Sequence, residues 1–419
     1  MRTMKDSGLS WVGEIPSDWV AHPVYYYFGE RKNKNIFGQE DNLLSLSYGR
    51  VIRKDINTNG GLLPESFNTY NIVEAGDIII RPTDLQNDKK SLRTGLCLER
   101  GIITSAYIAL RPIRRLNSGF FRYLLHAYDI SKVFYNMGNG VRQGLNFSEF
   151  SRLTVFEPPI EIQDKVTQYL DTATAEVDKI ISDIQTQIDT LEQYKRSVIT
   201  ETVTKGLNPN AEMKDSGVFY MAPMNATWRL TKIGYICSKL SRSFAPEDTA
   251  LICSNKGKVQ VRADDLTGIM VSDDNAMQGI RSGDIAIHGM DTWHGAIALS
   301  EYDGKITRVV HVCDSTEDKR FIVYYMQHLA FQGVYKLISN GVRGNTSDFR
   351  SWDKVRDIWI AIPETKEEQA AICDYLDSQC TAVEEVIATK KEQLEVLGEY
   401  KKSLIFEYVT GKKEVPCND

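Results

Sequence analysis

The sequence lacks the features that mark membrane and secreted proteins. Its 419 residues contain no apolar run of about 18 positions, so we expect no membrane-spanning helix. Residues 1–19 have no apolar core segment, which argues against a secretory signal. The seven cysteines are scattered and form no Cys-x-x-Cys pair, a usage typical of reduced thiols. We therefore expect a cytoplasmic protein with no membrane contact.

Motifs of common enzyme classes are also missing. There is no G-x-x-x-x-G-K-(S/T) phosphate loop, no His-Glu-x-x-His and no Gly-x-Ser-x-Gly. Glu157-Pro158-Pro159-Ile160 does not match the Asn/Asp-Pro-Pro-aromatic motif of an amino-methyltransferase. The sequence thus predicts a chain that is not an enzyme and holds no cofactor or metal. An enzyme with scattered catalytic residues is the alternative.

The net charge of −6 is unevenly distributed along the chain. Residues 21–158 hold 18 Lys and Arg against 13 Asp and Glu, and residues 213–362 hold 18 against 17. The acidic excess lies in the two segments 159–212 and 363–419. A weakly basic pair of regions is compatible with nucleic-acid binding, but it predicts weak binding by the chain alone.

An internal repeat determines the expected architecture. Residues 163–205 match residues 369–411 at a constant offset of 206, which pairs Tyr169-Leu170-Asp171 with Tyr375-Leu376-Asp377. The opening Met4-Lys5-Asp6-Ser7-Gly8 recurs as Met213-Lys214-Asp215-Ser216-Gly217. Between these shared segments the halves differ, apart from a Gly-Asp-Ile at 76–78 and 283–285. The chain is therefore expected to alternate variable globules with shared segments.

The shared segments 160–205 and 364–410 are predicted to be long helices. A proline precedes each, at 159 and 363, and apolar residues recur every three or four positions. About 40 residues would form a helix of roughly 60 Å. If the two helices pack on each other, chain order makes them antiparallel. Two independent amphipathic helices, each on its own globule, are the alternative.

The variable regions predict mixed α/β globules. Residues 76–81, 102–111, 283–288 and 306–313 are β-rich, whereas residues 119–137 and 318–339 have helical patterns. We expect an α/β (α+β) fold of two such domains, separated by two long helices in an antiparallel coiled coil, with a pseudo-twofold repeat. The predicted boundaries are 1–158 and 213–362 for the globules, and 159–212 and 363–419 for the helical spacers.

Several motifs, each present twice and in fixed order, resemble the specificity subunit of type I restriction–modification systems over almost the whole chain. They are the Lys-Asp-Ser-Gly openings, the loops 138–147 and 339–349, Glu161-Ile162-Gln163 with Glu367-Glu368-Gln369, the Tyr-Leu-Asp triplets, and the Tyr-Lys-(Arg/Lys)-Ser helix ends. The first half departs from the usual pattern in having Glu-Ile-Gln where Glu-Glu-Gln is more common.

The resemblance implies that each globule is a target-recognition domain for one half of a split, asymmetric site in double-stranded DNA. It also implies that helices 160–205 and 364–410 set the gap and dock two methyltransferase subunits, which a restriction/translocase subunit joins. S-adenosylmethionine, ATP and Mg²⁺ would bind those partners. A coiled-coil scaffold that binds only proteins is the competing interpretation.

The first candidate DNA-reading segment runs from position 81 to position 93. It combines cations with amides, which suit base edges and phosphates. Its candidate residues are Arg81, Gln86, Asn87, Lys89, Lys90 and Arg93. A solvated loop is the alternative.

The corresponding segment of the second half is residues 288–294. Its candidates are His288, Trp293 and His294. A metal site is disfavoured because the spacing is poor for one helical face and no third ligand cluster is evident. Base contact and ordinary loop structure remain open.

The paired loops 138–147 and 339–349 form the third candidate. Their residues are Arg142, Gln143 and Asn146 in the first half, and Arg343, Asn345 and Ser347 in the second. A shared loop cannot explain different half-sites, so phosphate is the expected contact, and a structural turn is the alternative. Lys32, Lys34, Arg50, Arg53 and Lys54 could add contacts with the DNA backbone.

Overall fold

The computed structural model describes residues 2–56, 66–83, 85, 92–133, 135, 144–262, 276–339 and 349–416. The chain divides into two compact units. Unit 1 comprises Met1–Ile184 and Glu392–Asp419, and unit 2 comprises Gln185–Lys391. Each unit contains one globular domain and parts of both long helices, α4 (Ile160–Lys205) and α9 (Lys366–Val409).

The globular domain of unit 1 is built on a four-stranded antiparallel sheet. Its strand order is β4 (Phe28–Glu30), β11 (Ile108–Pro112), β8 (Ile78–Ile80) and β9 (Thr94–Leu96). The smaller antiparallel pairs are β1 (Met4–Asp6) with β2 (Glu14–Pro16), β3 (Val20–Pro23) with β12 (Thr154–Glu157), β5 (Leu44–Ser47) with β6 (Arg50–Arg53), and β7 (Asn71–Val73) with β10 (Gly101–Ile103). The helices are α1 (Val24–Tyr27), α2 (Ser118–Ile130) and α3 (Phe147–Phe150).

The globular domain of unit 2 repeats this order of elements, although the two sequences differ. Its four-stranded sheet is β16 (Cys237–Lys239), β23 (Val310–Ser315), β20 (Ile285–His288) and β21 (Ile297–Leu299). The pairs are β13 (Met213–Lys214) with β14 (Met224–Asn225), β15 (Arg229–Lys232) with β24 (Trp359–Ile362), β17 (Leu251–Ser254) with β18 (Lys258–Val261), and β19 (Met277–Ile280) with β22 (Gly304–Thr307). The helices are α5 (Ile233–Ile236), the 3-10 turn η2 (Thr292–His294), α6 (Lys319–Phe331), α7 (Val334–Ile338) and α8 (Trp352–Arg356).

The expected mixed α/β globules are therefore confirmed, with two refinements of the predicted helices. The first ends at Ile130, and Lys132 follows with a positive φ of 57°. The second is split into α6 and α7 at Gly333, whose φ of 71° lies in the left-handed region.

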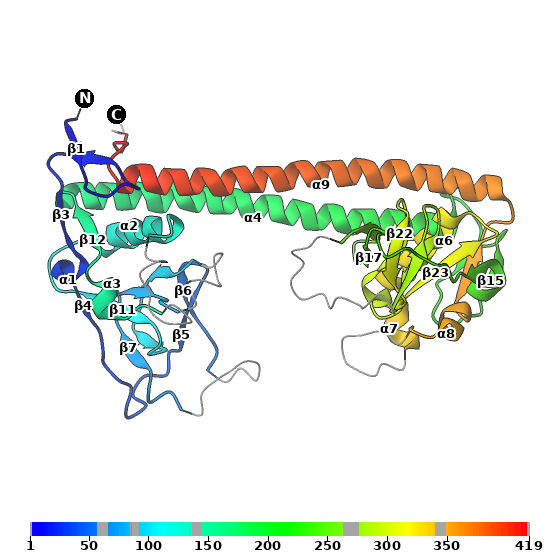
Figure 1. Ribbon diagram of the computed structural model, residues 1–419, viewed down its shortest axis with the longest axis horizontal. Helices are drawn as coiled ribbons and strands as arrows, with labels where there is room; N and C mark the ends of the chain where they lie inside the picture. Colours follow the sequence, from blue (N-terminus) through cyan, green and yellow to red (C-terminus); the bar gives the residue numbers. More distant parts are fainter. Residues whose placement is uncertain are drawn as a thin grey trace. The chain divides into compact units, whose positions relative to one another are not determined.

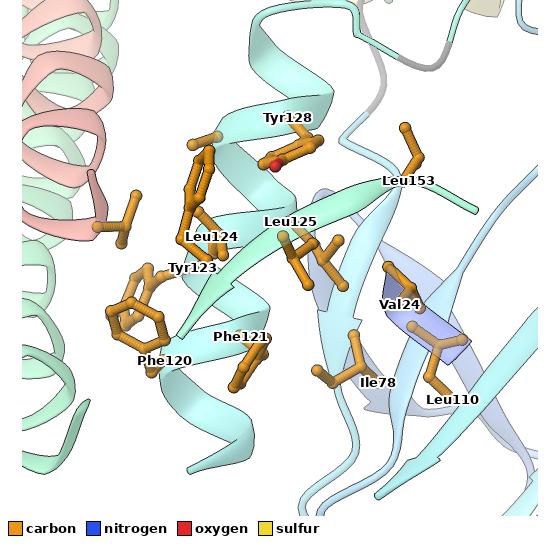
Figure 2. Close-up of a cluster of buried hydrophobic side chains, with 14 of the residues drawn as sticks. Val24, Ile78, Leu110, Phe120, Phe121, Tyr123, Leu124, Leu125, Tyr128 and Leu153 are labelled. Atoms are coloured by element: carbon orange, nitrogen blue, oxygen red, sulfur yellow. The ribbon is translucent and has the colours of Figure 1, made fainter. Parts of the chain in front are cut away.

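The core of unit 1 joins its sheet to the long helices through α2. Figure 2 shows Phe121 and Leu125 on the side of α2 nearest the strands that bear Ile78 and Leu110. Phe120, Tyr123 and Leu124 lie on the opposite side, toward the long helices. This two-sided burial follows from the apolar residues at consecutive positions of α2.

The two long helices pair antiparallel within each unit (Figure 1). In unit 1 the rings of Tyr169 and Tyr408 lie 4.6 Å apart, and Lys401 binds Asp178 further along. In unit 2, Lys390 donates to Gln187 and Lys195 binds Glu384. Along these contacts the residue numbers increase in α4 and decrease in α9. The predicted antiparallel coiled coil is confirmed, and independent helices are excluded.

Candidate nucleic-acid interface

Two of the repeated motifs attach the globular domains to the helices. Gln163 is buried, its Oε1 accepts the backbone N–H of Asn117 at 2.9 Å, and its Nε2 donates to the Pro158 carbonyl at 2.9 Å. Gln369 makes the same two contacts, accepting from Asp318 and donating to Pro363. Each glutamine thus bonds both to the carbonyl of a proline just before its long helix and to the backbone N–H of the N-cap residue of α2 or α6.

The aspartates of the Tyr-Leu-Asp triplets make the next attachment. Asp171 accepts the hydroxyl of Tyr123 at 2.8 Å, and Asp377 accepts that of Tyr324 at 2.6 Å. The tyrosines belong to α2 and α6, which follow the sheets of their domains. These shared side chains form hydrogen bonds within the chain. Attachment of the domains to the helices therefore accounts for their recurrence in both halves, with no need for a role in DNA reading.

The candidate loops occupy equivalent places in the two units. Residues 81–93 connect β8 to β9, and residues 289–296 connect β20 to β21, which are the matching strands of the two sheets. Each connection follows a strand whose first three residues, Ile78–Ile80 or Ile285–Ile287, are buried. Both candidate segments therefore begin at the end of matching strands, β8 in unit 1 and β20 in unit 2.

The structure also places the described ends of the paired loops, at Leu145 and Phe349, beside these connections. In unit 1 the backbone N–H of Leu145 donates to the carbonyl of Pro82 at 3.0 Å. In unit 2 the backbone N–H of Phe349 donates to the carbonyl of Gly289, also at 3.0 Å. Two candidate segments far apart in sequence therefore meet at one place in each domain.

Many of the candidate residues lie outside the described part of the chain. These are Gln86, Asn87, Lys89, Lys90, Arg142, Gln143, Arg343, Asn345 and Ser347. Their predicted contacts with DNA stay predictions.

Arg93 requires a correction. Its side chain is fully buried, Nε donates to the Tyr135 hydroxyl at 3.0 Å, and the guanidinium also donates to the carbonyl of Thr83. Its backbone N–H donates to the carboxylate of buried Asp129. The buried guanidinium stabilises segment 81–93 through these hydrogen bonds, and its burial does not fit the predicted contact with a base. Arg81, partly exposed at the end of β8, remains a candidate.

Asn146 is exposed and serves as the N-cap of α3. Its Oδ1 accepts the backbone N–H of Glu149 at 3.0 Å, and Glu149 accepts the backbone N–H of Asn146 in return. This capping box gives the residue a structural role. It supports the structural-turn alternative for that end of the loop.

The three candidates of the second half have different surroundings. His288 Nδ1 accepts the backbone N–H of Asp291 at 3.1 Å, and burial lowers the pKa of His288, although Asp291 acts in the opposite direction. Trp293 is partly buried with Lys336 over its ring, whereas His294 is exposed. Among the described residues, no group of three or more His, Cys, Asp or Glu side chains is placed to hold a metal ion.

Two of the five basic residues expected to add contacts with the DNA backbone, Arg50 and Arg53, are held by carboxylates. Arg53 pairs with Glu99, and Arg50 donates to Asp178 on α4 at 2.6 Å. Sequence reasoning missed the second contact, although the offset of 206 relates Asp178 to Glu384, which makes the matching contact with Lys258.

These features define a class of protein. It is a duplicated chain in which each of two mixed α/β domains is attached through glutamine, aspartate and tyrosine side chains to a pair of antiparallel helices. In the described residues no helix is long and apolar enough to cross a bilayer.

Comparison with solved structures identifies the fold. A structure reported for complex assembly and conformational transition of the type I R-M system matches with a TM-score of 0.66 at 14% identity, covering 95% of this chain and 99% of that one. The HsdS subunit from Thermoanaerobacter tengcongensis matches at 0.45 and 13%, covering 95% and 98%. The type I restriction–modification S subunit from M. genitalium matches at 0.39 and 12%, covering 93% and 96%.

No protein-family model matches the chain, and no curated protein matches it. The first structural likeness, which spans nearly the whole length of both chains, gives this chain the fold of a type I restriction–modification protein. The fold expected from the resemblance to type I specificity subunits is thereby confirmed.

Proposed function

We propose that this chain is the DNA-specificity subunit of a type I restriction–modification complex. Each globular domain reads one half of a split, asymmetric site in double-stranded DNA. The observation that carries this proposal is the duplicated loop pair, joined by Leu145–Pro82 in one unit and by Phe349–Gly289 in the other. Two equivalent loop sets with different sequences suit two different half-sites.

The long helices are proposed to set the gap between the half-sites and to dock two methyltransferase subunits. A stiff helix pair suits a fixed separation of two half-sites better than a flexible linker does. The acidic excess of segments 159–212 and 363–419 suits contact with proteins more than with DNA. The docking residues are proposed to lie within 160–205 and 364–410.

In this proposal the chain itself is not catalytic and acts in the cytoplasm. S-adenosylmethionine binds the methyltransferase subunits, and ATP and Mg²⁺ bind the restriction/translocase subunits. The missing enzyme motifs of the sequence support this division of labour.

The test is a map of modified bases in a host genome that expresses this chain with its methyltransferase partner, beside the same host without this chain. A split, asymmetric methylated motif that appears only with this chain is the expected result, and it supplies both half-sites. Unchanged methylation by an assembled complex would overturn the proposal and favour the scaffold interpretation.

A further inference from the structure

An ionic triad links the globular domain to both long helices in each unit. In unit 1, Asp178 of α4 accepts Lys401 of α9 at 2.5 Å and Arg50 of the β5–β6 hairpin at 2.6 Å. Lys401 donates to one oxygen of the Asp178 carboxylate and Arg50 donates to the other. One side chain thus holds the helix pair together and the hairpin against it.

The same triad recurs in unit 2 with the helices exchanged. Glu384 of α9 accepts Lys195 of α4 at 2.7 Å and Lys258 of the β17–β18 hairpin at 2.6 Å. Glu384 lies 206 positions after Asp178, and Lys401 lies 206 positions after Lys195. The hairpin cations, however, belong to the divergent globules, and each is the first residue of its strand, β6 or β18.

Each triad borders a cleft between hairpin and helices. The unit 1 cleft has a volume of about 680 Å³, and its lining includes Arg50, Asp178, Lys401 and Asp171. The unit 2 cleft has the same volume, about 680 Å³, and its lining includes Lys195, Lys258, Glu384 and Asp377. In each unit α2 or α6 contacts the helices through its glutamine, tyrosine and apolar contacts, and the triad adds a separate contact at the hairpin, with open space beside it.

Two separated attachments restrict rotation in a way that one cannot. The contacts of α2 or α6 hold one side of the domain, and loss of the triad would remove the ion-paired contact of the hairpin and let the width of the cleft vary. The triad removes this freedom at little gain in stability, because Arg50 and Lys258 are 70% and 62% exposed and exposed ion pairs contribute little.

We propose that Asp178 and Glu384 are positioning residues that fix the orientation of each recognition domain on the helices. They thereby determine how sharply the complex selects one gap length between half-sites. This inference rests on the proposed function, since it concerns how the two half-site readers are held.

The test uses the full chain assembled with its methyltransferase partner, with Arg50→Gln and Lys258→Gln made singly. The DNA probes carry the half-sites found in the modified-base map, with the native gap and with one base pair added or removed. Each substitution is expected to reduce the preference for the native gap about threefold, with the preferred bases of both half-sites and the melting temperature unchanged. Lys256→Gln, at an exposed lysine on the second hairpin, is the matched control and should keep the wild-type preference.

Inverting the whole unit 1 triad should restore the preference lost in Arg50→Gln. The variant combines Arg50→Glu, Asp178→Lys and Lys401→Glu, which keeps both ion pairs with opposite signs. An unchanged gap preference in the single variants, or its loss together with a lowered melting temperature, would overturn the inference. Absence of any split-site recognition by the wild-type complex would instead contradict the proposed function, so the two failures are distinguishable.

Discussion

At the scale of single residues, the two halves differ at one position that the repeat makes visible. The indole N–H of Trp228 donates to Glu368 at 2.9 Å. Trp19, its counterpart, has no hydrogen-bond partner for Nε1 among the described residues. The residue of unit 1 that corresponds to Glu368 is Ile162, so the Glu-Ile-Gln departure removes the acceptor for a buried indole.

Glu368→Ala is therefore expected to destabilise unit 2. It leaves the Trp228 N–H buried without its acceptor, at a cost of about 1–3 kcal/mol. Urea unfolding of the full chain measures the change. Glu367→Ala, at the exposed neighbouring position, is the control and should cost far less; equal losses for both would contradict the assignment.

A second residue-scale prediction concerns pH. Burial lowers the pKa of His328 to about 4, from an ordinary value of 6.5. As the pH falls below 6.5, the unfolded chain binds this proton before the folded chain does, so stability decreases between about pH 6.5 and 4. His328→Gln, which cannot take up this proton, should reduce the acid destabilisation by at most about 3 kcal/mol. Unfolding free energies at pH 7 and pH 4.5 provide the comparison; identical pH dependence in both proteins would refute it.

At the scale of elements, short polar contacts connect structures that hydrophobic periodicity alone would leave unconnected. Gln163 links the start of α4 to the start of α2, and Gln369 links the start of α9 to the start of α6. Gly206 and Gly411 follow α4 and α9, near Trp228 and Trp19. Both glycines have positive φ, 85° and 71°, which suits a residue that follows a helix. These contacts explain why such positions recur at a constant offset.

Gln163→Ala should weaken the attachment of α2 to α4. It leaves the Asn117 N–H and the Pro158 carbonyl without their partner, for an expected loss of about 2–4 kcal/mol. Gln168→Ala, on the exposed face of the same helix, is the control. Denaturant unfolding followed by circular dichroism measures both, and a loss below that of the control would show that the contact is dispensable.

At the scale of the whole molecule, each unit takes its helices from both halves of the chain. The core of unit 1 includes Leu404 and Val409 from the end of α9, and that of unit 2 includes Ile199 and Val203 from the end of α4. Unit 1 is therefore completed by residues from the far end of the chain, whereas unit 2 is the continuous stretch Gln185–Lys391. Removing one half should expose apolar surface in the other.

The proposed role of the helices in setting the gap gives a prediction at this scale. Inserting four residues, about one helical turn or roughly 6 Å, after Ile184 and after Lys391 should lengthen the recognised gap by about two base pairs. Both half-sites should stay as they are. Methylation mapping of the insertion variant checks this, and altered half-sites with an unchanged gap would show that the helices do not set the spacing.

The sequence by itself determined the duplication, the two long helices and their antiparallel order. Repeats and periodicity are local properties of the chain, and chain order leaves one direction for a paired second helix. Only the tertiary structure showed that the divergent globules share one topology, because sheet pairing depends on contacts distant in sequence. It also decided that Arg93 is buried, that Leu145 meets Pro82, and that Asp178 binds Arg50. Burial and ion pairing are set by which segments the fold brings together, and residue type alone does not specify that.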